Sequence, residues 1–106
     1  MKQIYIAGSF RGKHSWEIHQ NVLEAEAKGA ELIGQGYAPI IPHKITENMQ
    51  GLYPDETFLE VCMEWLKRSD SIYMLPGWLF SEGSREELKL AQELGLEVIY
   101  GCLTML

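Results

Sequence analysis

The chain alternates short β-rich segments with longer segments of helical periodicity, and Gly and Pro residues separate them. The predicted strands are 2–7, 37–41, 71–75 and 97–100, and the predicted helices are 16–35, 55–68 and 84–94. This alternation constrains the fold strongly, because parallel strands joined by right-handed helical crossovers bury both faces of one sheet. We therefore expect a three-layer α/β/α domain of flavodoxin-like or Rossmann-like type, with a small parallel sheet of about four strands.

Local features refine this expectation. Pro39 predicts that segment 37–41 is an edge strand, because proline cannot donate a hydrogen bond to a sheet. Ser84 and Glu87 have the S-x-x-E spacing of a capping box that begins a helix, and residues 43–54 are typical of a loop. The predicted buried face of the first helix consists of Ile18, Val22, Ala25, Gly29 and Ile33.

Length and charge limit the classes of function. The 106 residues suit a single domain, 1–106, and a net charge of −6 argues against a nucleic-acid polymer as partner. The sequence contains neither a signal-peptide pattern nor a membrane-spanning run, so we expect a cytoplasmic protein that does not bind membranes. Its two cysteines, Cys62 and Cys102, suit free thiols in a reducing compartment.

Ligands of parallel α/β sheets bind beyond the carboxyl ends of the strands, which selects the loops 8–15, 43–54 and 76–84. The candidate ligand-binding residues in these loops are Gly8, Ser9, Phe10, Arg11, Gly12, His43, Gly77, Trp78, Ser81, Gly83 and Ser84. The segment 8–12 could hold an anion with backbone N–H groups and a guanidinium, or it could be an ordinary turn with a solvated arginine. Trp78 could stack on a base, or it could cover the core or contact a partner.

Glu87 shares a helical stripe with Ala91 and Leu94, so its carboxyl group is predicted to lean towards the sheet, where an anion suits a nucleophile. The alternative is a purely structural role in the capping box. The three histidines are scattered without the spacing of metal ligands, so we expect no metal site and no cofactor.

Three stretches resemble the nucleoside 2-deoxyribosyltransferase superfamily, in particular the 2'-deoxynucleoside 5'-monophosphate N-glycosidases and a related group of short proteins. They are 4–12 (IYIAGSFRG), 63–70 (MEWLKRSD) and 81–88 (SEGSREEL). The resemblance implies that Glu87 is the catalytic nucleophile, that Tyr5 accompanies it, and that Ser9, Arg11 and Ser81 hold a 5'-phosphate. It also implies a homodimer or larger homo-oligomer.

One position departs from the pattern of that superfamily, because Cys62 stands where its second catalytic acid would fall. His43, Asp55 or a water could supply the proton instead. The expected function is therefore N-glycosidic bond hydrolysis, or deoxyribosyl transfer, on a small-molecule nucleotide or nucleoside. Two alternatives stay open at this point: a nucleotide-binding or sensing module without catalysis, and a structural oligomerisation protein.

Overall fold

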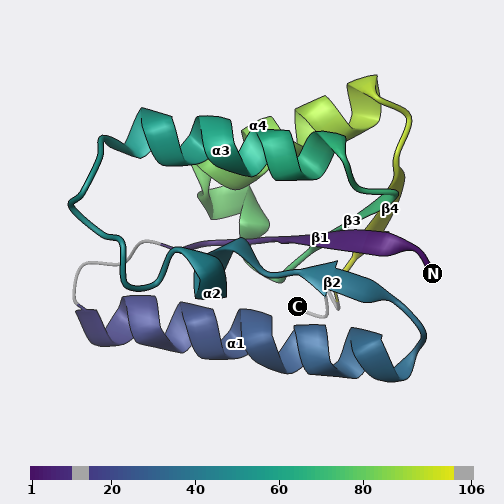
Figure 1. Ribbon diagram of the computed structural model, residues 1–106, viewed down its shortest axis with the longest axis horizontal. Helices are drawn as coiled ribbons and strands as arrows, with labels where there is room; N and C mark the ends of the chain where they lie inside the picture. Colours follow the sequence, from purple (N-terminus) through teal and green to yellow (C-terminus); the bar gives the residue numbers. More distant parts are fainter. Residues whose placement is uncertain (11–14, 102–106) are drawn as a thin grey trace.

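A computed structural model describes residues 1–10 and 15–101 of the protein (Figure 1). The strands are β1 (Gln3–Ala7), β2 (Ala38–Ile40), β3 (Ser71–Met74) and β4 (Glu97–Tyr100). The helices are α1 (Ser15–Gly34), α2 (Pro42–Ile45), α3 (Asp55–Lys67) and α4 (Glu82–Glu93), with a short 3-10 helix, η1 (Trp78–Phe80), before α4. The order of strands and long helices agrees with the predicted alternation.

The four strands form one parallel sheet in the order β2-β1-β3-β4. Helices α3 and α4 cover one face of the sheet, and α1 and α2 lie on the other face (Figure 1). The predicted three-layer α/β/α fold is therefore confirmed, with the strand order of a flavodoxin-like sheet. Strand β2 is at the edge of the sheet, which agrees with the expectation from Pro39.

Side chains of β1 alternate between the two halves of the core. Tyr5 packs in the half beneath α3 and α4, and Ile4 and Ile6 pack in the half beneath α1. All three are fully buried, so both faces of the central strand are apolar, as expected for a parallel sheet covered on both sides.

The predicted buried face of α1 was wrong at its end. Leu32 is 3% exposed and packs in the core, whereas Ile33 is 61% exposed. The stripe begun by Val22 and Ala25 continues to Leu32 at spacings of three and four residues, and the next residue is turned away by about 100°.

Two further sequence-based expectations were wrong. The expected loop 43–54 begins within the one-turn helix α2, which Pro42 can start because the first helical N–H needs no partner. Ser84 does not cap α4: the helix begins at Glu82, and the Oγ of Ser81 accepts a hydrogen bond from the N–H of Ser84 at 3.2 Å. Ser81 is therefore the N-cap, and Glu87 lies inside the helix.

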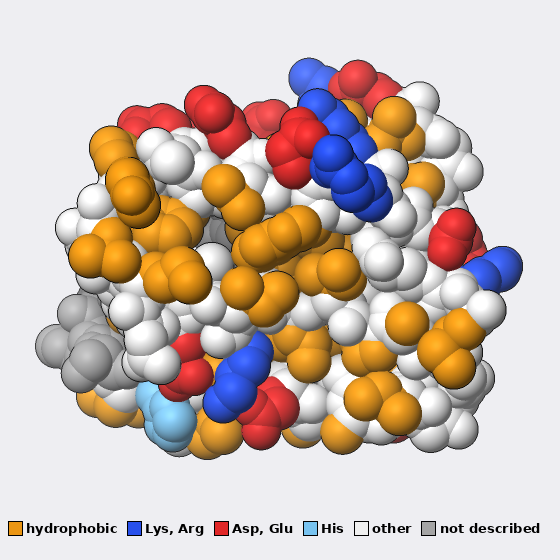
Figure 2. Space-filling view, viewed as in Figure 1, with side chains coloured by type: hydrophobic (Ala, Val, Ile, Leu, Met, Phe, Trp, Pro, Cys, Tyr) orange, Lys and Arg blue, Asp and Glu red, His pale blue; other side chains and the backbone are white. Residues whose placement is uncertain are grey.

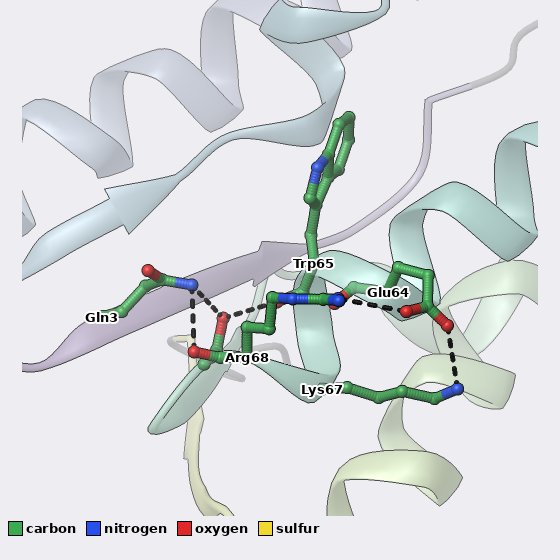
Figure 3. Close-up of polar contacts among 6 residues, drawn as sticks. Gln3, Glu64, Trp65, Lys67 and Arg68 are labelled. Atoms are coloured by element: carbon green, nitrogen blue, oxygen red, sulfur yellow. Dashed lines mark hydrogen bonds and ion pairs between the residues drawn. The ribbon is translucent and has the colours of Figure 1, made fainter.

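A polar group joins the carboxyl end of α3 to the amino end of β1 (Figure 3). The Nε2 of Gln3 donates hydrogen bonds to the Oγ of Ser69, at 3.0 Å, and to the carbonyl oxygen of Arg68, at 3.3 Å. The Oγ of Ser69 in turn donates to the carbonyl of Trp65, whose ring points away from this group. The segment 63–70 therefore has a structural role at the amino end of the sheet.

The visible face of the molecule carries hydrophobic side chains gathered across its middle, with charged side chains mostly towards its margins (Figure 2). Over the described chain as a whole, the exposed apolar residues include Leu52, Tyr53 and Phe80, and Phe80 is 91% exposed. Within the described part of the chain, no helix has both the length and the apolar character needed to cross a membrane.

Candidate functional site

A cleft of about 590 Å³ lies beside the carboxyl end of β1, between α2, α3 and the start of α4. In the order β2-β1-β3-β4, the chain runs from β1 to β2 on one side of it, and then from β2 to β3 on the other side of β1. The connections therefore diverge at the carboxyl end of β1, and ligands of such sheets bind in the crevice that forms there. The predicted site residues that line the cleft are Tyr5, Gly8, Ser9, Phe10, His43, Ser81, Gly83, Ser84 and Glu87.

Two of the predicted residues that the structure describes, Gly77 and Trp78, are not among those that line the cleft. Gly77 is the left-handed residue that starts η1, and Trp78 packs against the core and against the ring of Tyr100, with ring centroids 5.8 Å apart. Trp78 therefore covers the core, which was the alternative interpretation of this residue. Arg11 and Gly12 lie outside the described residues.

Glu87 and Tyr5 form a buried hydrogen-bonded pair on the floor of the cleft. The hydroxyl of Tyr5 donates to Oε2 of Glu87, which is only 6% exposed. Burial raises the pKa of Glu87 to about 7, although the hydrogen bond from Tyr5 lowers it. Burial and the neighbouring carboxyl group raise the pKa of Tyr5 well above its usual value, so Tyr5 stays protonated and remains a donor.

Cys62, a half-buried residue of α3, lines the cleft next to this pair. Its thiol is free, and burial raises its pKa to about 11, with a further increase from the charge of Glu87 and a decrease from hydrogen bonding with Tyr5. The thiol is therefore protonated at neutral pH, and its reactivity as a nucleophile is suppressed.

His43 presents a hydrogen-bond acceptor from α2. Its Nε2 lies 3.0 Å from the carbonyl oxygen of Gly8, which can only accept, so Nε2 carries the proton. Burial lowers the pKa of His43, and the neutral ring therefore has a bare lone pair on Nδ1. That atom is buried without a hydrogen-bond partner among the described residues, so His43 is unsuited to donate a proton at neutral pH.

The start of α4 brings two serine hydroxyls to the cleft. Ser81 is the N-cap, and its own O–H remains available as a donor while its oxygen accepts from the backbone. Ser84 is 1% exposed, and its Oγ has no hydrogen-bond partner within the described part of the chain. Gly83 between them leaves open space, because an added Cβ would meet only Leu59, at 3.8 Å.

Sequence reasoning named only Asp55 and Cys62 from one wall of the cleft, which α3 forms. The first half of α3 contributes Asp55, Glu56, Phe58 and Leu59, and α4 adds Glu82 and Glu86. The sequence did contain a signal for this wall. The expected loop 43–54 lies at the ligand-binding edge of the sheet, and α3 begins directly after it, so the first turns of α3 must lie at the same edge. Of the described residues, no Lys or Arg lines the cleft, and no three potential ligands are grouped to hold a metal ion.

The fold and the cleft define a small parallel α/β protein with a buried carboxyl group at the ligand-binding edge of its sheet. The chain belongs to the family described as "Domain of unknown function (DUF4406)", which matches residues 2–100. No curated protein matches the chain significantly.

Proposed function

We propose that the protein cleaves or transfers the N-glycosidic bond of a nucleoside 5'-monophosphate, with Glu87 as nucleophile. The observation that carries this proposal is the buried carboxyl group of Glu87, which lines a cleft large enough for a small ligand and is held by the hydroxyl of Tyr5. The resemblance of segments 4–12 and 81–88 to nucleoside 2-deoxyribosyltransferases supports the same assignment.

The proposed reaction is a double displacement. An oxygen of Glu87 attacks C1' of the sugar, and the C1'–N bond breaks with its electron pair going to the base. The base takes a proton from water, because the N–H of His43 already donates to Gly8. Water, or an acceptor base, then attacks C1' and releases the carboxylate of Glu87.

The electrostatics of the cleft support this reaction. The transition state of glycosyl transfer develops positive charge on the sugar ring, which nearby carboxylates stabilise. Glu87 must be ionised to attack, and its pKa of about 7 makes the carboxylate available at neutral and higher pH. The hydroxyl of Tyr5 fixes the position of the carboxyl group by its hydrogen bond to Oε2.

The 5'-phosphate is proposed to bind at Ser9 and Ser81, together with Arg11, which follows from the resemblance described above and lies outside the described residues. Ser9 and Ser81 both line the cleft, and Ser81 caps the amino end of the 12-residue helix α4, where the helix dipole favours an anion. Binding energy from the phosphate would align C1' with the carboxylate, as remote contacts commonly do in enzymes.

The test is base release from a panel of nucleoside 5'-monophosphates and the matching nucleosides, measured by chromatography, with Glu87→Ala as the control enzyme. A thermal-shift assay with the same compounds runs in parallel, because a ligand that binds the folded state raises its melting temperature. The proposal expects release that requires the 5'-phosphate and disappears in Glu87→Ala. No release and no thermal shift with any compound would overturn it.

Cys62 favours a second candidate, a nucleotide-binding module without catalysis. A thiol with a pKa of about 11 replaces the acid that would protonate the departing base. This candidate expects a thermal shift with a nucleotide and no base release.

The exposed apolar residues Leu52, Tyr53 and Phe80 support the expectation of a homo-oligomer, which light scattering of the purified protein tests directly.

A further inference from the structure

The hydroxyl of Ser84 is a buried polar group whose partner is missing from the described chain. Ser84 is 1% exposed, lines the cleft, and has no hydrogen bond at Oγ. Nearly all buried hydroxyls in proteins are hydrogen-bonded, because removing one from water without compensation is costly. An orphaned hydroxyl at the wall of a cleft therefore points to a ligand group that completes it.

A structural role of Ser84 in capping α4 does not explain this hydroxyl. The cap belongs to Ser81, whose Oγ accepts from the N–H of Ser84. The Oγ of Ser84 makes no bond to the backbone of the preceding turn, as serines within helices often do.

Ser84 and Glu87 lie on the same face of α4, one turn apart. Side chains three residues apart on a helix are neighbours, with Cβ atoms about 5–6 Å from each other. Both side chains line the cleft. The separation of the two side chains is therefore about the width of one sugar ring.

The stereochemistry of the reaction selects the sugar hydroxyl. In a double displacement on a β-nucleotide, the carboxylate approaches the face of the ring opposite the base. In a ribonucleotide that face carries the 2'-hydroxyl, on the carbon next to C1', and the 3'-hydroxyl one carbon further on. Hydrogen bonds to the 2-hydroxyl group strengthen as a glycosidic bond breaks, so a donor or acceptor at this position assists the reaction.

We propose that the Oγ of Ser84 binds the 2'-hydroxyl of the ligand, so that the substrate class is ribonucleoside 5'-monophosphates in preference to their 2'-deoxy counterparts. This inference rests on the proposed function, because it uses Glu87 as the group that contacts C1'. It assigns the choice between ribose and deoxyribose to one residue.

The test compares the 5'-monophosphates of one base with ribose, 2'-deoxyribose and 3'-deoxyribose by dissociation constant. Rates of cleavage are not compared, because an electron-withdrawing 2'-hydroxyl by itself slows the breaking of the glycosidic bond, whichever protein residue it contacts. The wild-type protein is expected to prefer the ribose compound over the 2'-deoxy compound by up to about tenfold, the ratio that one neutral hydrogen bond supports. In Ser84→Ala this ratio falls to about one. Ser71→Ala is the matched control, because Ser71 is a fully buried serine that binds Glu97 and lies outside the cleft.

A loss of ribose preference in Ser84→Ala would not be caused by loss of folding stability. Ser84→Ala removes an unpaired hydroxyl from a helix, so its melting temperature is expected to equal or exceed that of the wild type. Ser84→Gly provides a second variant without the hydroxyl. Equal dissociation constants of the wild type for the ribose and 2'-deoxyribose compounds would overturn the inference, and so would a preference in binding that follows the 3'-hydroxyl. If nucleotides bind but without a preference for ribose, only the inference on Ser84 fails. If no nucleotide binds or reacts, the proposed function fails as well.

Discussion

The hydroxyl of Tyr5, on the first strand, donates a hydrogen bond to the carboxyl group of Glu87, 82 residues further along the chain on the last helix. This contact joins the interior of the sheet to the floor of the cleft. It keeps the Glu87 carboxyl group in a buried position that raises its pKa to about 7.

Glu87→Gln is expected to stabilise the protein more at pH 8 than at pH 5. The pKa of Glu87 is about 7 in the folded protein and about 4.3 in an unfolded chain, so the folded state binds the additional proton and loses stability as the pH rises from about 4 to 7. Glutamine does not titrate, so its advantage grows by about 2–3 kcal/mol between these pH values. Denaturant unfolding at both pH values measures it, with Glu93→Gln on the exposed part of α4 as control. An advantage independent of pH would contradict the buried carboxyl group.

Tyr5→Phe is expected to raise the pKa of Glu87 further, because the hydrogen bond from Tyr5 is the contact that lowers it. The variant also leaves a buried acceptor without its donor, which costs about 1–3 kcal/mol of folding stability. If Glu87 is the nucleophile, the rising limb of the pH–rate profile for base release moves to higher pH. A profile that keeps its wild-type midpoint would show that Tyr5 does not set the ionisation of Glu87.

Cys62 is expected to react slowly with alkylating reagents in the folded protein. With a pKa of about 11, only about 0.1% of this thiol is ionised at pH 8, compared with about a quarter of an unperturbed cysteine. In a Cys102→Ser variant, which isolates Cys62, modification at pH 8 should be more than about 100-fold slower than in denaturant. Similar rates in both conditions would mean that Cys62 is not buried beside Tyr5 and Glu87.

Gly8→Ala is expected to destabilise the protein more than Gly29→Ala. A Cβ on Gly8 would lie 2.6 Å from Cδ1 and 2.8 Å from Cβ of Leu75, and the latter atom cannot move without the backbone. Overpacking of this kind costs about 1–3 kcal/mol. A Cβ on Gly29 meets the flexible end of Ile41, at 2.5 Å, and alanine favours the interior of helix α1. Thermal melts of the two variants compare the costs, and an equal or larger loss in Gly29→Ala would contradict this.

Most of the fold followed from local patterns. The β-rich composition of β1, the long helical segments and the edge position that Pro39 imposes are properties of short stretches, and the structure agrees with each. The errors concern positions where a local pattern permits two outcomes. Both Leu32 and Ile33 are apolar, and only the direction of the helix decided that Leu32 is buried.

The candidate site was predictable to a smaller extent. The rule for parallel sheets selected the correct edge, and most of the residues named from the loops there line the cleft. Most of the wall from α3 was missed apart from Asp55 and Cys62, because an acid such as Glu56 has an equally good explanation at the start of a helix. Trp78 was placed in the site by its loop, although its ring packs on the core.

The sequence by itself determined the alternation of strands and helices, the parallel sheet and the edge at which a cleft forms, because these depend on periodicity and on Gly and Pro at known spacings. Only the tertiary structure decided the position and the environment of the Glu87 side chain. Its spacing from Ser84 fits a capping box, yet the helix begins earlier, and the carboxyl group turns inward to Tyr5. The pKa of Glu87 is raised because the carboxyl group is buried among residues that are distant in the chain. Such desolvation depends on how the elements pack together, so no local sequence pattern could predict it.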